Sequence, residues 1–159
     1  QYGVIPVSPE HCPSVNAEAA QTFADWLVSG AGQDAIAAVE SRGFIFGAPL
    51  AHQMGLPLVP VRKPGKLPAA IYTTEFTLEY GNSALELHTD GINAGEKVLV
   101  VDDLLATGGT ALAAVRLLRR AGAEVSHALF VIDLPDLGGA TTLAEHHIES
   151  LSLIAFAGH

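Results

Sequence analysis

Short apolar runs alternate with amphipathic stretches along most of this chain, and loops rich in Gly, Pro and polar residues separate them. Runs of four or five apolar residues are typical of strands buried on both faces, whereas apolar positions three and four apart are typical of helices. The expected strands are 35–39, 58–61, 98–101, 125–132 and 149–156, and the expected helices are 17–29, 44–54, about 111–121 and 141–146. This order predicts an α/β fold with a mainly parallel five-stranded sheet flanked by helices.

Residues 70–90 depart from this alternation and predict a flexible hairpin inserted before strand 98–101. A polar arm at Tyr72–Tyr80 leads into a Tyr80-Gly81-Asn82 turn, and Ala84–His88 then alternates apolar and polar residues. Two extended segments around a turn that contains Gly are a hairpin signal.

Polar loops at 40–43, 62–68 and 102–110 each follow a predicted strand. Ligands of parallel α/β sheets bind beyond the carboxyl ends of the strands, so we expect these three loops to converge on one edge. Half of the eight basic residues lie in the first two loops: Arg42, Arg62, Lys63 and Lys66. In an acidic chain this concentration indicates an anion site.

The composition narrows the possible function classes. A chain of 159 residues, 49% of them hydrophobic, fits one domain with a sizeable core, so we expect a single domain over residues 1–159. No apolar run approaches the ~18 residues that a membrane span needs, and a net charge of −9 leaves no broad basic face for nucleic acid. The single cysteine, Cys12, excludes an internal disulfide and fits a reducing, cytoplasmic location.

Residues 98–110, Val-Leu-Val-Val-Asp-Asp-Leu-Leu-Ala-Thr-Gly-Gly-Thr, carry the strongest functional signal. An apolar strand ends at an acidic pair, and a Gly-containing loop then opens a helix. The backbone N–H groups of such a loop and the helix N-terminus bind phosphate, while adjacent carboxylates suit the two hydroxyls of a ribose. The segment therefore predicts a ribose 5-phosphate site. It is not a P-loop, because no Lys-Ser/Thr pair follows the glycines.

This segment resembles the 5-phosphoribosyl 1-diphosphate signature of the type I phosphoribosyltransferase family, and its form is most similar to the adenine phosphoribosyltransferase branch. Three further motifs agree with that family: Glu40-Ser41-Arg42-Gly43-Phe44, Arg62–Pro68 and Leu78-Glu79-Tyr80-Gly81. The resemblance covers about residues 35–156. Residues 1–34 are expected to be an atypical or truncated base-binding part, because Tyr2–Pro9 lacks clear counterparts of the family's aromatic, Arg and Asp residues.

The resemblance implies a role for each motif. The 5-phosphoribosyl 1-diphosphate is expected to bind through Asp102, Asp103, Ala106, Thr107, Gly108, Gly109 and Thr110, with the acidic pair on the ribose hydroxyls. Its diphosphate is expected to bind through Ser41, Arg42, Gly43, Arg62, Lys63 and Lys66. A cis peptide bond is expected at Glu40–Ser41, and Arg62 is expected to reach toward the site of a partner subunit.

The resemblance also implies the catalytic and base-binding residues. Glu79 is expected to assist proton transfer at the purine, beside Tyr80 in a mobile loop. Base contacts are expected from Val4, Ile5 and Leu105. Mg²⁺ is the expected cofactor, without a tight site of its own, bound together with substrate near Asp102 and Asp103.

The implied reaction joins adenine to 5-phospho-α-D-ribose 1-diphosphate, forming AMP and diphosphate in purine salvage, in a homodimer. Two alternatives stay open at this point. An enzyme for hypoxanthine, guanine or xanthine would fit the unusual N-terminal segment, and an assay across the purine bases distinguishes it. A non-catalytic purine-sensing regulator would need a basic DNA-binding domain, for which this acidic chain offers neither the length nor the charge.

Overall fold

The computed structural model describes residues 32–78 and 81–157, and these are built around a five-stranded parallel sheet. The strands are β1 (Ala35–Val39), β2 (Leu58–Val61), β5 (Val98–Leu105), β6 (His127–Asp133) and β7 (Glu149–Ala155). Their order in the sheet is β2-β1-β5-β6-β7, and every neighbouring pair is parallel. The expected mainly parallel sheet is confirmed.

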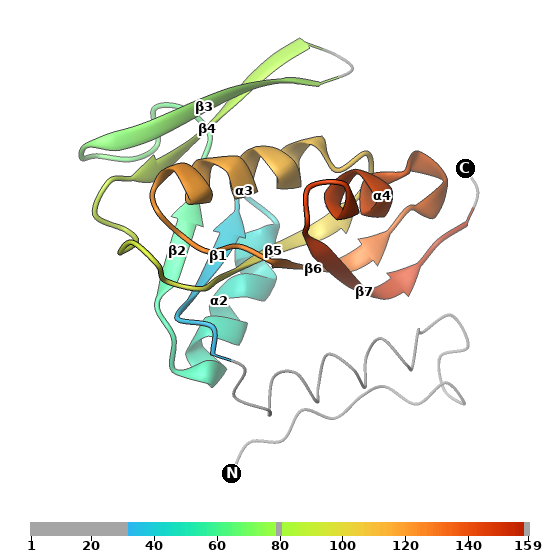
Figure 1. Ribbon diagram of the computed structural model, residues 1–159, viewed down its shortest axis with the longest axis horizontal. Helices are drawn as coiled ribbons and strands as arrows, with labels where there is room; N and C mark the ends of the chain where they lie inside the picture. Colours follow the sequence, from blue (N-terminus) through green and yellow to red (C-terminus); the bar gives the residue numbers. More distant parts are fainter. Residues whose placement is uncertain (1–31, 79–80, 158–159) are drawn as a thin grey trace.

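Helices cover both faces of the sheet (Figure 1). On one face lies α2 (Gly43–Met54), packed against Ile36, Leu99 and Val101. On the other lie α3 (Gly109–Arg120) and α4 (Gly139–Ala144), over a larger core that includes Val98 and Val100. Because alternate residues of β1 and β5 face the two cores, these central strands are apolar throughout their buried length. None of the described helices is long and apolar enough to cross a membrane.

The inserted segment forms a two-stranded antiparallel sheet, β3 (Ile71–Leu78) and β4 (Gly81–His88), which lies across the outer side of α3 (Figure 1). Leu85 and Leu87 of β4 are buried in the core beneath it. Arg120, in the last turn of α3, donates a hydrogen bond to the Thr73 carbonyl oxygen (2.9 Å), and its guanidinium lies 5.7 Å from the centre of the Tyr72 ring. The predicted hairpin is therefore present and rests on α3.

Several expected boundaries were wrong. The strand expected to end before the acidic pair continues through Asp102 and Asp103 to Leu105, because β6 goes on pairing with it as far as Leu105–Asp133. Gly81, expected in the hairpin turn, pairs with Leu78 and begins β4. The last helix begins at Gly139 and ends at Ala144, two residues earlier than expected at each end. The helix expected over 17–29 lies outside the described residues.

Candidate functional site

The acidic pair lies where β5 loses one of its two neighbours. β1 pairs with β5 only as far as Ala38–Val101, whereas β6 continues along Asp102, Leu104 and Leu105. The backbone of residues 102–105 is thus held on one side by a strand, and its other side faces the loop that follows β1. This is the carboxyl end of the parallel strands, where open α/β sheets bind their ligands.

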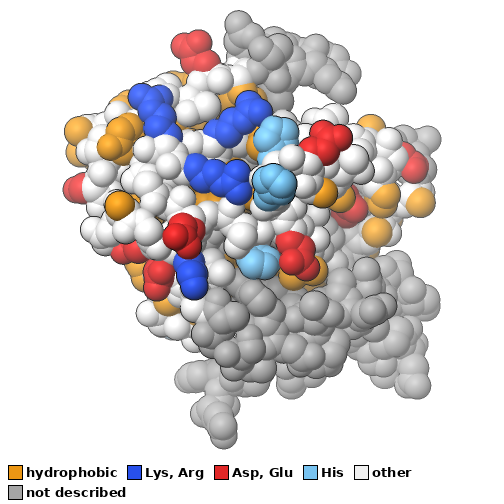
Figure 2. Space-filling model, in the orientation of Figure 1, with side chains coloured by type: hydrophobic (Ala, Val, Ile, Leu, Met, Phe, Trp, Pro, Cys, Tyr) orange, Lys and Arg blue, Asp and Glu red, His pale blue; other side chains and the backbone are white. Residues whose placement is uncertain are grey.

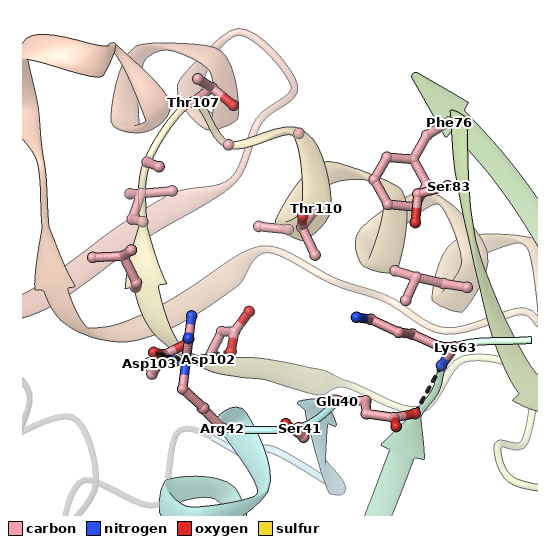
Figure 3. A pocket seen from close by; sticks show the side chains of 17 residues that line it. Glu40, Ser41, Arg42, Lys63, Phe76, Ser83, Asp102, Asp103, Thr107 and Thr110 are labelled. Carbon is pink, nitrogen blue, oxygen red and sulfur yellow. Dashed lines mark hydrogen bonds and ion pairs between the residues drawn. The ribbon is translucent and has the colours of Figure 1, made fainter. Parts of the chain in front are cut away.

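A cleft of about 380 Å³ opens at this edge (Figure 3). All three predicted loops contribute to it, so their expected convergence is confirmed. The residues that line it are Glu40, Ser41, Arg42, Lys63, Phe76, Ser83, Leu85 and the continuous segment 102–111. Basic, acidic and backbone groups therefore face one cavity, as binding of a phosphorylated, hydroxylated ligand requires.

The loop after β1 brings Arg42 against the acidic pair. Its Nε lies 2.5 Å from Oδ2 of Asp103. The Glu40–Ser41 peptide bond is cis, as expected. Gly43 makes the close approach possible, since a Cβ there would lie 2.8 Å from the Val101 carbonyl oxygen and 2.9 Å from Oδ1 of Asp102. The Ser-Arg-Gly motif thus positions a guanidinium at the mouth of the cleft.

The basic loop after β2 is attached to Glu40. The Glu40 carboxylate accepts hydrogen bonds from the Lys63 backbone N–H (2.9 Å) and from Nε of Arg62 (3.2 Å). The Lys63 hydrogen bond, assisted by Arg62, holds the pKa of Glu40 below its usual value, so this carboxylate stays ionised. With its backbone fixed in this way, Lys63 extends its side chain into the cleft (Figure 3). Glu40 therefore positions Lys63, whose side chain faces the cleft.

Burial gives Asp102 an unusual pKa. Desolvation, together with the neighbouring Asp103, raises the pKa of Asp102 from 3.8 to about 7, although the Asp103 N–H donates to its Oδ1 (2.9 Å) and Arg42 opposes the shift. Two adjacent carboxyl groups in a half-buried site favour a bound cation or hydroxyl donors. This is the environment in which a diol or a divalent metal ion gains most from its contacts.

The segment after β5 is the one in which a phosphate cradle is expected. It turns at Gly108, whose φ of 84° is in the left-handed region, and α3 begins at Gly109. The first turn of α3 contains no acidic residue, so nothing in that turn opposes an anion at its N-terminus. Thr110 stands beside the centre of the cleft, while Thr107 lies at its far end (Figure 3).

Most of the predicted site residues are brought together, and a few are not. Lining the cleft are Ser41, Arg42, Lys63, Asp102, Asp103, Leu105, Ala106, Thr107, Gly108, Gly109 and Thr110. Gly43, Arg62 and Lys66 do not line it. Arg62 instead contacts its own chain, bonding Glu40 and the Lys66 carbonyl oxygen (3.3 Å) and lying 5.9 Å from the Phe44 ring centre. Val4, Ile5, Glu79 and Tyr80 lie outside the described residues.

Six lining residues were not among the predicted site residues: Glu40, Phe76, Ser83, Leu85, Leu104 and Ala111. Phe76, Ser83 and Leu85 reach the cleft from the hairpin, and the alternation along 84–88 was the one signal of an inward face. Leu104 also lines the cleft and is half-buried, whereas Leu105 is 1% exposed and packs in the core. Leu104 therefore offers the more accessible apolar surface of the two.

The carboxylates of Asp102 and Asp103 could take part in holding a metal ion but are too few to form a closed site. Among residues 32–78 and 81–157, no three His, Cys, Asp or Glu side chains are grouped to bind a metal. Two carboxylates beside an expected phosphate site suit Mg²⁺, which binds oxygen ligands and takes most of them from water and substrate phosphates.

Comparisons with known proteins agree with this geometry. Residues 13–147 match the model of the phosphoribosyl transferase domain. The adenine phosphoribosyltransferase of Erythrobacter litoralis is 59% identical over 129 residues, which are 81% of this chain and 72% of that protein. The adenine phosphoribosyltransferase of Saccharomyces cerevisiae, solved with D-2,5-dideoxy-2,5-imino-altritol 1,6-bisphosphate and adenine, superposes with a TM-score of 0.78 at 36% identity, covering 86% of this chain and 76% of that one.

A more distant structure has the same fold. The Trypanosoma brucei adenine phosphoribosyltransferase, in complex with AMP, pyrophosphate and ribose-5-phosphate, has a TM-score of 0.75 at 26% identity. The comparison covers 84% of this chain and 61% of that one.

Proposed function

The chain belongs to the adenine phosphoribosyltransferase family, and we propose that it joins adenine to 5-phospho-α-D-ribose 1-diphosphate, forming AMP and releasing diphosphate in purine salvage. In this transfer a purine nitrogen attacks the anomeric carbon, the bond from that carbon to the diphosphate oxygen breaks, and the purine loses a proton. The two alternatives, an enzyme for oxopurines and a purine-sensing regulator, have less support, because the relatives named above are adenine phosphoribosyltransferases.

The observation that carries the proposal is the order of groups around one cleft. The cradle at 106–110 offers backbone N–H groups for the 5′-phosphate, and Asp102 and Asp103 lie next to it for the ribose hydroxyls. Lys63 lies across the cleft from the acidic pair and Arg42 lies beside it, and both would supply positive charge for the departing diphosphate. The anomeric carbon would then lie between the acidic pair and Lys63.

We propose that Glu79, next to Tyr80 in the chain, takes part in proton transfer. The support is the Leu78-Glu79-Tyr80-Gly81 motif and the course of the hairpin, whose Phe76 and Ser83 line the cleft on either side of Glu79 along the chain. A carboxylate delivered from outside the sheet can approach the purine after both substrates have bound.

Asp102 and Asp103 are the residues that would hold Mg²⁺ together with the substrate. When bound, the ion would neutralise charge on the diphosphate donor and so make its approach to the acidic pair favourable. The two carboxylates also restrict where the ribose can lie, since Asp103 is already paired with Arg42.

We propose a homodimer in the cytoplasm. Its support is apolar surface on and beside α2, where Ile45 is 66% and Phe46 40% exposed. The predicted reach of Arg62 into a partner's site requires it to leave its contacts with Glu40 and Phe44. Light scattering at micromolar concentration should give about twice 16.5 kDa. A fully active monomer would contradict both the assembly and the role of Arg62.

A turnover assay tests the function. The purified chain is incubated with the diphosphate donor, Mg²⁺ and, in separate reactions, adenine, hypoxanthine, guanine or xanthine. We expect adenine to give the highest kcat/KM and AMP and diphosphate as products. The Asp102→Asn/Asp103→Asn double variant, purified in parallel, controls for a contaminating host enzyme. Preferential use of an oxopurine would overturn the adenine assignment.

A further inference from the structure

The phosphate cradle has a neighbour on its outer side that none of the site motifs includes. After β6 the chain passes Pro135–Leu137 as a 3₁₀ turn and enters α4 at Gly139. The Leu134 N–H donates to the Leu105 carbonyl oxygen (2.9 Å), which ties this connection to the end of β5. The first turn of α4 therefore lies directly behind the loop that starts at Ala106.

The contact between α4 and the cradle leaves no room for a side chain at position 139. A Cβ on Gly139 would lie well under 3.0 Å from the Ala106 carbonyl oxygen and 2.8 Å from Cδ1 of Leu105. The contact is reciprocal, since a Cβ on Gly108 would lie 3.0 Å from the Gly139 carbonyl oxygen and 3.3 Å from Cβ of Thr142. Two backbone segments thus meet face to face, and the position of one fixes that of the other.

α4 is itself held in place at its far end. Nη1 of Arg119 donates to the His146 carbonyl oxygen (3.2 Å), Nη2 of Arg116 lies 3.2 Å from Nε2 of His146, and Nδ1 of His146 lies 3.0 Å from the Thr142 carbonyl oxygen. Figure 2 shows basic and His side chains gathered on this face of the molecule. These side chains hold α4 against α3, the helix whose N-terminus forms the other end of the cradle.

We propose that Gly139 is a positioning residue for the 5′-phosphate site, with the first turn of α4, through Gly139 and Thr142, forming the rear wall of the 106–109 loop. This rests on the proposed function, in which that loop binds the 5′-phosphate. The wall touches no substrate and sets the width of the cradle by preventing the loop from moving outward. Any side chain at 139 displaces Ala106 and the loop that it begins, and with it the backbone N–H groups that would bind the phosphate. The binding of anything that carries a 5′-phosphate then weakens, while the diphosphate site, built from Arg42 and Lys63, is untouched.

The test separates the two phosphate sites by steady-state kinetics and by direct binding. For Gly139→Ala we expect a rise of at least tenfold in KM for the diphosphate donor, with KM for adenine within twofold of the original value. By calorimetry, Kd for ribose 5-phosphate should rise by a similar factor, and Kd for diphosphate with Mg²⁺ should stay within twofold. A role in stability alone would lower Tm and leave these ratios unchanged.

Gly138→Ala is the matched control. Gly138 has a φ of +72°, so Ala is strained there and Tm should fall, but nothing lies within 4 Å of the added Cβ and both binding constants should be retained. If Gly139→Ala behaves as Gly138→Ala does, the proposal is wrong.

Thr142→Ala keeps the proposal testable if Gly139→Ala does not fold. It removes the hydrogen bond from Oγ1 to the Gly138 carbonyl oxygen (3.1 Å) and should raise KM for the donor about twofold to fivefold, without an equal change for adenine. If KM for the donor does not rise in this variant, or rises by the same factor as KM for adenine, the proposal is overturned. If the original chain binds ribose 5-phosphate but turns over no base, the proposed function fails, and the ribose 5-phosphate titrations still decide the role of Gly139.

Discussion

The unit β5–loop–α3 and the hairpin β3–β4 both line the cleft, but they are held in the molecule in different ways. β5 is buried between β1 and β6 as far as Val101, and α3 packs a continuous apolar face on the sheet. The hairpin strands pair with each other in a separate two-stranded sheet, and their described polar contacts lie near its base. Arg120 donates a hydrogen bond to the Thr73 carbonyl oxygen. The backbone of Glu86 forms a β-bridge with Arg62, and its carboxylate accepts a hydrogen bond from the Gly65 N–H.

This difference suits the two regions to different roles in the proposed reaction. Residues 102–110 are fixed by the core, so the geometry that we propose for binding ribose 5-phosphate does not depend on the ligand. The hairpin is fixed at its base and runs outward from there toward residues 79–80. We propose that Glu79, between the two hairpin strands in the sequence, acts on a substrate that has already bound. Binding and proton transfer would thus be assigned to separate parts of the chain.

Replacement of Glu79 tests this division most strongly. We expect Glu79→Gln to lower kcat by roughly 10²–10⁴, because the amide cannot accept a proton, while Kd for the diphosphate donor stays within about twofold. Glu75→Gln, an exposed position on the same hairpin, is the control and should be near the original activity. Stopped-flow or steady-state kinetics, together with a donor titration, measures both effects. A near-normal kcat would remove Glu79 from the mechanism, and a large loss of donor binding would mean that hairpin and cradle are not separate.

Replacement of Asp102 and Asp103 tests the role of the β5–loop–α3 unit. In the Asp102→Asn/Asp103→Asn variant we expect donor affinity to fall on the order of 10–100-fold, because charged hydrogen-bond partners of the ribose and the metal ion are lost. Binding of inorganic phosphate, which needs the 106–110 cradle alone, should change far less. Calorimetric titration of both ligands against both proteins decides it. Equal losses for the two ligands would show that the pair shapes the loop and does not hold the ribose.

The same contrast explains what could be predicted from the sequence. The strand, acidic pair and cradle are consecutive residues, so one stretch of sequence carried their geometry, and a five-stranded sheet followed from apolar runs of strand length. Phe76 and Ser83 reach the cleft through a hairpin folded over α3, a long-range contact that no local pattern specifies. The end of β5 was misplaced for a related reason. The polar residues Asp102 and Asp103 do not end the strand, because β6 continues to pair with it.

Leu104 and Leu105 show that, even within one motif, the sequence does not tell which side chain is accessible from the cleft. Both are apolar, and an acidic pair beside them does not tell which side chain is accessible. Only the packing of Gly139 against Leu105 shows that the latter is enclosed by the core. The contact comes from α4, more than thirty residues further along the chain.

The pH dependence of the stability of the ligand-free protein tests whether the buried Asp102 carboxylate destabilises the fold. Because burial raises the pKa of Asp102 from 3.8 to about 7, the folded state holds this proton more tightly than the unfolded state does. The contribution of Asp102 to stability is therefore fully present below the lower value and is lost as the pH rises toward about 7, by on the order of 1–3 kcal/mol. Urea unfolding at several pH values measures this slope, and Asp102→Asn should remove most of it. A slope unchanged in that variant would assign the effect to other groups.

The smallest expected effect concerns the anchor of the hairpin. Arg120→Ala removes the hydrogen bond to the Thr73 carbonyl oxygen and the stacking on Tyr72, which together contribute about 1 kcal/mol at an exposed position. If the hairpin is a separate unit, this loss stays local: amide hydrogen exchange should speed up along β3 and β4 but not along β5. Donor affinity should be unchanged, and kcat should fall by about twofold to fivefold because the tip is less often in position. Arg120→Lys, which keeps the charge but not the planar stacking, should lie between the two. Faster exchange in β5 as well would mean that the hairpin and the cradle unfold together, and the division of work between them would have to be abandoned.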